Sequence, residues 1–190
     1  MIIVSQNMAN YDIPLPADCI FRINLAWVNE INELEELLKK HTQHNIFLDL
    51  PVGRTKPPNN RYTMDDIIPI LNEYSNIKFL AISNVNNKDD IQKYLPGVPK
   101  SITLVPKIES TDGINNINEI VDSLPYHEKI IMLDHDDLYT SVMNKHNSPT
   151  SFKKYFLELS DFCNKNNITL LRTVGVMFSD EEKKVTQYSK

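Results

Sequence analysis

The chain has 190 residues, of which 41% are hydrophobic and 24% are charged, with a formal net charge of −5. This composition supplies enough apolar side chains for a core and excludes an intrinsically disordered chain. No apolar run approaches the ~20 residues of a membrane span, and an acidic chain lacks the basic surface typical of nucleic-acid binding. We therefore expect neither a membrane nor a nucleic-acid partner.

Glycine and cysteine usage narrow the function classes further. The only four glycines are Gly53, Gly97, Gly113 and Gly175, and they cannot form a glycine-rich phosphate loop. Cys19 and Cys163 match no disulfide framework and no C-x-x-C motif. The first residues lack the basic and apolar regions of a secretory signal peptide. These features predict a protein of the reducing cytoplasm.

Short apolar, β-branched runs alternate with helical periods along the chain. The expected strands span residues 2–4, 19–25, 45–50, 77–83, 101–108, 129–133 and 168–173. The expected helices carry apolar residues at helical spacing within residues 31–38, 67–74, 91–95, 114–124 and 152–163. Thr63 and Asp66 form a capping-box pattern before the second helix, and Pro69 is expected to kink or delay that helix.

The spacing of the expected strands indicates the fold class. From the second strand onward their starts lie roughly 25 to 40 residues apart, which is the length of a βα unit. One α/β domain over residues 1–190 is therefore expected. A TIM-type (β/α) barrel and a doubly wound open sheet both fit the alternation. The polar strand ends described next favour the barrel, and about seven parallel strands make it compact and incomplete.

A polar residue interrupts the apolar run at the carboxyl end of nearly every expected strand. On strand spacing, Arg22 shares a face with Asn24, and Lys107 shares a face with Glu109. Polar groups that converge at one end of a parallel barrel are where barrel enzymes keep their chemistry. The residues at these ends are Arg22, Asn24, Asp49, Ser83, Lys107, Glu109, Asp137 and Thr173.

Three segments in the second half of the chain carry a resemblance to a known family. They are residues 105–110 (VPKIES), 113–120 (GINNINEI) and 131–138 (IMLDHDDL). This run resembles pyruvate kinase, which has a K-I-E strand end, a G-V-x-N-x-x-E-I helix start and an I-M-V-A-R-G-D-L segment at closely similar spacing. Shorter matches bring the resemblance to about residues 20–175.

Metal-dependent aldolases of the citrate lyase and hydroxy-oxo-diacid type share part of this pattern. The chain therefore resembles the wider phosphoenolpyruvate/pyruvate barrel superfamily. The resemblance implies a Mg²⁺- or Mn²⁺-dependent enzyme that acts on phosphoenolpyruvate, pyruvate or a related 2-oxoacid through an enolate. It leaves open phosphoryl transfer and aldol or lyase chemistry.

The resemblance also implies a role for each matching position. Glu109 and Asp137 match the carboxylates that hold the metal ion. Lys107 matches the lysine that neutralises charge on the enolate oxygen or on the transferring phosphoryl group, and Arg22 matches the arginine that meets phosphate. The substrate-binding positions are Thr173, Ser83, Asn24 and Asp49. Thr173 matches a contact to the substrate carboxylate, whereas Asn24 and Asp49 match ligands of the monovalent cation.

Several positions depart from the family pattern and support an alternative function. Asp136 and Tyr139 stand where the family has glycines that let the backbone approach the oxoacid. Ala26 and Trp27 replace a serine and a histidine, which removes a ligand of the monovalent cation. The short segment between Asp49 and Thr63 has no room for the lid domain. We therefore do not expect full pyruvate kinase activity, and the alternative is a catalytically degenerate domain with a binding or assembly role.

Other interpretations of the charged segments remain open at this point. Lys107 with Glu109 also fits an ordinary salt bridge at a strand end. The acidic segment 134–137 fits a solvated turn, or a transition-metal site that includes His135. The basic segment around Arg54 reads first as an exposed connection.

An incomplete barrel has consequences for assembly. Its first and last strands keep free edges, and free edges pair readily with other strands. We therefore expect a homodimer, or a partner chain, that covers the open side of the barrel.

Overall fold

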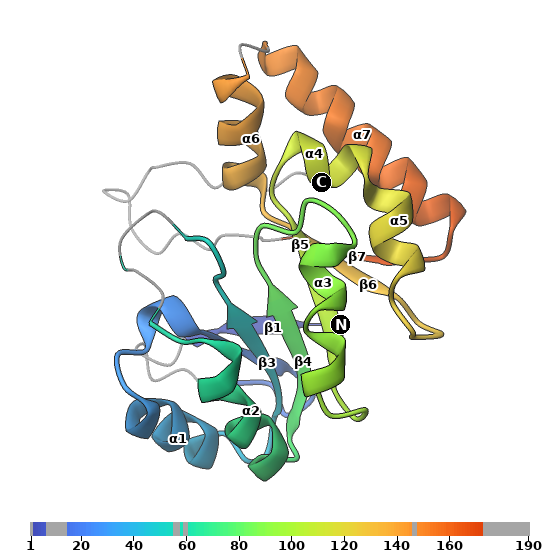
Figure 1. Cartoon of the computed structure of the whole chain (residues 1–190). Helices are drawn as coiled ribbons and strands as arrows, with labels where there is room; N and C mark the ends of the chain where they lie inside the picture. The colour runs from blue at the N-terminus through green and yellow to red at the C-terminus, as the bar shows by residue number, and fades with distance from the viewer. Residues whose placement is uncertain (1, 7–14, 55–57, 59–60, 146–147, 173–190) are drawn as a thin grey trace.

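The computed structural model describes residues 2–6, 15–54, 58, 61–145 and 148–172. Its strands form one seven-stranded parallel sheet whose spatial order follows the chain (Figure 1). They are β1 (Ile3–Ser5), β2 (Ile20–Asn24), β3 (Asn45–Leu50), β4 (Ile77–Ile82), β5 (Thr103–Ile108), β6 (Ile130–Leu133) and β7 (Thr169–Arg172). All seven expected strands are confirmed, with small differences at their ends.

Helices connect these strands and cover one face of the sheet (Figure 1). They are α1 (Ile31–Lys40), α2 (Met64–Glu73), α3 (Asp89–Gln92), α4 (Thr111–Asn115), α5 (Ile117–Asp122), α6 (His135–Asn144) and α7 (Pro149–Lys165), with short 3₁₀ helices η2 (Leu25–Trp27) and η3 (Leu95–Gly97). Helix α6 was not among the expected helices, because its first turn reads as an acidic loop. None of the described helices is long and apolar enough to cross a membrane.

The start of α2 confirms the capping box. The Thr63 hydroxyl accepts from the Asp66 backbone N–H at 3.4 Å, and the Thr63 N–H donates to the Asp66 carboxylate at 2.8 Å. The helix begins at Met64 and continues through Pro69, so the expected delay is wrong. The N–H that Pro69 lacks would have bonded the carbonyl of Asp65, an exposed residue of the first turn whose carbonyl water can reach.

Two hydrophobic clusters lie on the two faces of the sheet. The larger one joins strand residues to the helices, and it includes Leu34, Leu48 and Ile120. The smaller cluster contains strand residues alone: Ile20, Phe47, Ala81, Val105, Ile130 and Met132. Because a strand's side chains alternate between faces, the smaller cluster marks the inner, concave face.

The sheet is an incomplete barrel, as expected. It curls around the smaller cluster, and its strand pairs run from β1–β2 through β6–β7. Within the described part of the chain, no pairing joins β7 back to β1. The carboxyl ends of the strands therefore form one open rim, beyond which α6 rises (Figure 1).

Candidate functional site

The polar side chains at the strand ends continue the inward-facing rows of the sheet. Ile20 and Phe47 belong to the inner cluster, so Arg22 on β2 and Asp49 on β3, two residues further along each strand, point to the same face. The same alternation places Lys107 above Val105 on β5. Apolar layers therefore fill the inside of the curled sheet, and a charged layer covers them at its carboxyl end.

A buried ion network forms this charged layer. Asp49 is fully buried, and its Oδ2 accepts from the Arg22 guanidinium and from Lys107 Nζ, the latter at 3.3 Å. Lys107 Nζ also lies 3.0 Å from Glu109 Oε1 and donates to Ser83 Oγ at 2.9 Å. These three contacts match the three donors of an ammonium group. The network therefore brings together five residues from four neighbouring parts of the sheet.

Burial and charge act in opposite directions on the ionisable groups of this network. Burial raises the pKa of Asp49, but the charges of Lys107 and Arg22 outweigh burial and hold that pKa below its ordinary value. Burial lowers the pKa of Lys107, but Asp49 and Glu109 outweigh it and raise that pKa. Asp49 and Lys107 are therefore both charged at neutral pH.

Glu109 behaves differently from Asp49. Burial raises its pKa above the ordinary value, because burial outweighs the lowering by the Lys107 ammonium and by the N–H of Asn84. An additional cation beside Glu109 would favour the ionised carboxylate. The strand end therefore has a carboxylate whose charge is only partly compensated by the protein.

A cluster of three carboxylates lies beside the ion network. One carboxylate oxygen from each of Glu109, Asp134 and Asp137 lies within 4.8 Å of the others, and this group could hold a metal ion. Glu109 is buried, whereas the two aspartates are half-buried. Hard carboxylate oxygens suit Mg²⁺ or Mn²⁺, and three ligands leave positions for water or substrate.

The start of α6 positions the two aspartates. Asp134 follows β6 directly, and its Oδ1 caps α6 by accepting from the backbone N–H groups of Asp136 and Asp137 at 3.2 and 3.3 Å. Asp137 lies in the first turn of the helix. The acidic segment is therefore a helix start, not a turn. His135 lies outside the carboxylate group, with its ring 5.9 Å from Phe156, so the site built on His135 is not supported.

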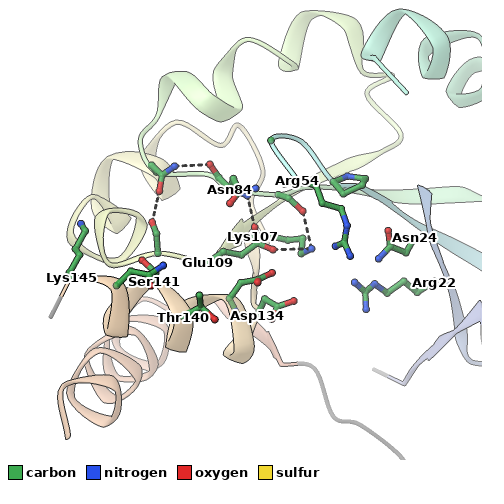
Figure 2. A pocket seen from close by; sticks show the side chains of 17 residues that line it. Arg22, Asn24, Arg54, Asn84, Lys107, Glu109, Asp134, Thr140, Ser141 and Lys145 are labelled. Atoms are coloured by element: carbon green, nitrogen blue, oxygen red, sulfur yellow. Dashed lines mark hydrogen bonds and ion pairs between the residues drawn. The ribbon is translucent and has the colours of Figure 1, made fainter. Parts of the chain in front are cut away.

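The charged groups line an open cleft of about 430 Å³, a size typical of small-molecule sites. Figure 2 shows Arg22 and Arg54 on one side of it, and Glu109 and Asp134 nearer the centre. Thr140, on α6, lines another part of the wall. The cleft is therefore cationic on one side and acidic in the middle.

The structure assembles most of the predicted site residues at this cleft. Arg22, Asn24, Ser83, Lys107, Glu109 and Asp137 line it, and Asp49 lies beneath them in the ion network. Thr173 lies outside the described residues.

Some of the predicted site residues have local roles. The Asn24 side chain accepts from the N–H of Ala26 at 3.0 Å and so caps η2. Tyr139 does not line the cleft; it packs edge-on against Phe152, at 5.5 Å between ring centroids. The side chain that replaces this family glycine therefore lies outside the cleft.

Among the cleft residues that were not predicted as site residues, three bear on its chemistry: Asp134, Arg54 and Asn84. Asp134 lies two residues after Met132, and Ile130 and Met132 on β6 point to the inner face. The alternation of side chains along the strand could therefore have predicted that Asp134 points inward as well. Arg54 was interpreted as part of an exposed loop, although it faces into the cleft (Figure 2). Asn84 carried no sequence signal, because its role depends on a backbone N–H.

Comparison with known proteins adds information on the fold. No protein-family model matches the chain, and no curated protein matches it. Among solved structures, it is similar to RipC from Yersinia pestis, with a TM-score of 0.59 and 16% sequence identity over 86% of this chain and 73% of that one. At this identity the likeness shows the shared fold alone.

These findings correct the resemblance to pyruvate kinase and to the phosphoenolpyruvate/pyruvate superfamily. No family model supports it, and the solved structures that match include RipC. The physical reason for the error lies in the short motifs themselves. A strand end such as VPKIES joins an apolar run to alternating charges, and any parallel sheet with a polar rim requires this pattern. The roles inferred below therefore rest on geometry.

Proposed function

We propose that the protein is a divalent-metal-dependent enzyme that binds a small 2-oxoacid and stabilises the enolate formed from it. The observation that carries this proposal is the meeting of three carboxylates, Glu109, Asp134 and Asp137, in a cleft that Arg22 and Lys107 also line. A metal site and an anion site then lie side by side. A 2-oxoacid has the complementary groups, a carboxylate and a keto oxygen on adjacent carbons.

The formal charges at the cleft support this ligand class. Asp49, Glu109, Asp134 and Asp137 are acidic, and Arg22, Lys107 and Arg54 are basic, so the seven groups sum to a formal charge of −1. Lys145, at the edge, is paired with Asp112 at 2.6 Å and adds nothing. A divalent cation would change the sum to +1, which favours a singly charged carboxylate.

The chain's own residues supply two further parts of the proposed chemistry. Arg22 and Arg54 lie where they can pair with the carboxylate of the substrate and fix its orientation. Lys107 has its three donors engaged, so it acts through its buried positive charge and through its hold on Glu109. A preorganised charge in a buried layer stabilises negative charge that develops on the keto oxygen. The bound metal would act there as a Lewis acid.

A binding experiment tests this proposal directly. Oxalate serves as the probe, because its two adjacent carboxylates imitate the planar enolate of a 2-oxoacid. We expect Mg²⁺ to raise Tm by mass action, and calorimetry to show oxalate binding only with Mg²⁺ present. Glu109→Gln and Asp134→Asn should each abolish both effects. Asp122→Asn, on the exposed end of α5, is the matched control and should change neither.

Two results of the same experiment would redirect the proposal. If Mg²⁺ does not change Tm, or if Glu109→Gln responds like the wild type, the metal site is refuted. If Mg²⁺ binds but neither oxalate nor pyruvate does, the chain is a metal-binding domain without this activity, which is the binding role considered from the sequence.

The cysteines support the cytoplasmic location that we propose with this function. Cys19 and Cys163 are both buried and free. Burial raises the pKa of the Cys163 thiol to about 11, so this group stays an unreactive thiol at neutral pH. Neither cysteine therefore depends on an oxidising compartment.

A further inference from the structure

The loop after β4 makes a direct contact with one of the three carboxylates. The backbone N–H of Asn84 donates to Glu109 Oε2 at 2.6 Å (Figure 2). Glu109 Oε1 faces Lys107 at 3.0 Å. Each carboxylate oxygen has a second lone pair, so both remain able to bind a cation. The two contacts fix the plane of the carboxylate from both sides.

The direction of this N–H depends on an uncommon backbone conformation. Asn84 has φ of +56°, in the left-handed region of the backbone that residues other than glycine, Asn and Asp seldom adopt. Its side chain secures the conformation by donating to the carbonyl of Val52 at 2.7 Å. The neighbouring Gly53 has φ of +68°. Two adjacent loops are thus locked together at the edge of the cleft.

A chain of amide contacts continues from Asn84 to the helices behind the site. The side chain of Asn86 donates to the Asn84 carbonyl at 2.9 Å, and that of Asn116 donates to the Asn86 carbonyl at 2.8 Å. Val85, between Asn84 and Asn86 in the chain, is fully buried. Gly113 allows this packing, because a Cβ there would lie 2.6 Å from the Val85 carbonyl oxygen.

We propose that Asn84 is a positioning residue that holds Glu109 in the orientation required for metal binding. This inference rests on the proposed function, since it assumes that Glu109 is a ligand. A flexible glutamate must lose side-chain freedom when it binds a cation. The N–H of Asn84 removes that freedom in advance. Groups that orient metal ligands in this way typically contribute 10- to 100-fold to metal affinity.

Two variants of Asn84 separate this role from a merely structural one. Asn84→Ala and Asn84→Gly both lose the contact with Val52, but only glycine keeps the left-handed backbone without strain. We expect Asn84→Ala to bind Mn²⁺ about tenfold more weakly, measured by electron paramagnetic resonance titration. Asn84→Gly should stay within about threefold of the wild type.

The chain offers a matched control at Asn167. This exposed residue, between α7 and β7, is the other described non-glycine residue with positive φ, at +54°. Asn167→Ala introduces the same backbone strain away from the cleft. It should lower Tm as Asn84→Ala does and leave Mn²⁺ affinity unchanged.

The outcomes distinguish this inference from the proposed function. If the wild type binds no Mn²⁺, the proposed function fails, and the inference fails with it. If the wild type binds Mn²⁺ and Asn84→Ala binds it equally well, only the inference is overturned. An equal loss in Asn84→Ala and Asn84→Gly would also overturn it. Asn116→Ala, which removes the support of Asn86, provides a milder test should Asn84→Ala not fold.

Discussion

Replacement of Lys107 by methionine tests whether the buried ion network stabilises the fold. Lys107 is 4% exposed and lies between Asp49, at 0%, and Glu109, at 5%. Methionine is similar in length and shape to the lysine stem, so the change removes the charge without opening a large cavity. Any loss of stability then reports mainly on electrostatics.

The structure gives the expected size of this effect. Removal of one partner from a buried ion pair typically destabilises a protein by about 3–5 kcal/mol, because the other charge stays buried without compensation. Asp49 keeps Arg22, and Glu109 can take up a proton, so we expect the lower end, about 3 kcal/mol. For a domain of this size, that is a fall in Tm of about 6–12 °C.

Urea and thermal unfolding at pH 7, followed by circular dichroism, measure this loss. The double variant Lys107→Met/Glu109→Gln should recover part of it, because it removes an uncompensated charge. Lys39→Met is the control, since Lys39 pairs with Glu35 on the exposed surface of α1, and it should leave Tm unchanged. A loss below about 1 kcal/mol in Lys107→Met would refute the reasoning.

Three further predictions follow from other features. Burial raises the pKa of Asp49, but the charges of Lys107 and Arg22 outweigh burial and lower that pKa. The ionised carboxylate therefore stabilises the fold fully at pH values above its pKa in the unfolded chain, about 4. This contribution is lost as the pH falls through the lower pKa of the folded protein. In thermal melts, the Tm gap between the wild type and Asp49→Asn should stay constant from pH 7 to about 5 and shrink in more acidic buffer; a gap that closes between pH 7 and 5 would contradict this. Gly113→Ala places a Cβ 2.6 Å from the Val85 carbonyl oxygen. This variant should lower the free energy of unfolding in urea by about 1–3 kcal/mol. An unchanged urea midpoint would show that the loop around Val85 can move to relieve the clash. β1 and β7 are the outer strands of the described sheet, and we expect a homodimer that covers this side. A monomeric mass in light scattering at all concentrations would exclude it.

The periodic part of the fold was predictable from the sequence. Buried parallel strands are continuous apolar runs, so their positions are visible without the partner strands. Helix α6 was missed because its polar residues are concentrated at the start. His135, Asp136 and Asp137 there read as a solvated turn, although acidic residues are favoured in the first turn of a helix.

The candidate site was predictable as a place but not as a set of contacts. The alternation along β2 and β5 correctly placed Arg22 and Lys107 at one rim. It could not indicate that Lys107 would be enclosed by two carboxylates, because that depends on how strongly the sheet curls. The contact of Asn84 with Glu109 involves a backbone N–H, which every residue except proline has, and so leaves no trace in the sequence.

The contact between Lys107 and Asp49 has a mechanical consequence for the sheet. The two residues stand on β5 and β3, which are separated by β4, and in a flat sheet such strands would lie nearly 10 Å apart. Their side chains nevertheless meet at 3.3 Å. In a closed barrel, pairing of the first and last strands holds the curvature that strand twist produces, whereas no such pairing appears in the described part of this sheet. The ion pair acts here as a brace across the arc, so that the groups of the cleft also maintain the curvature that brings them together.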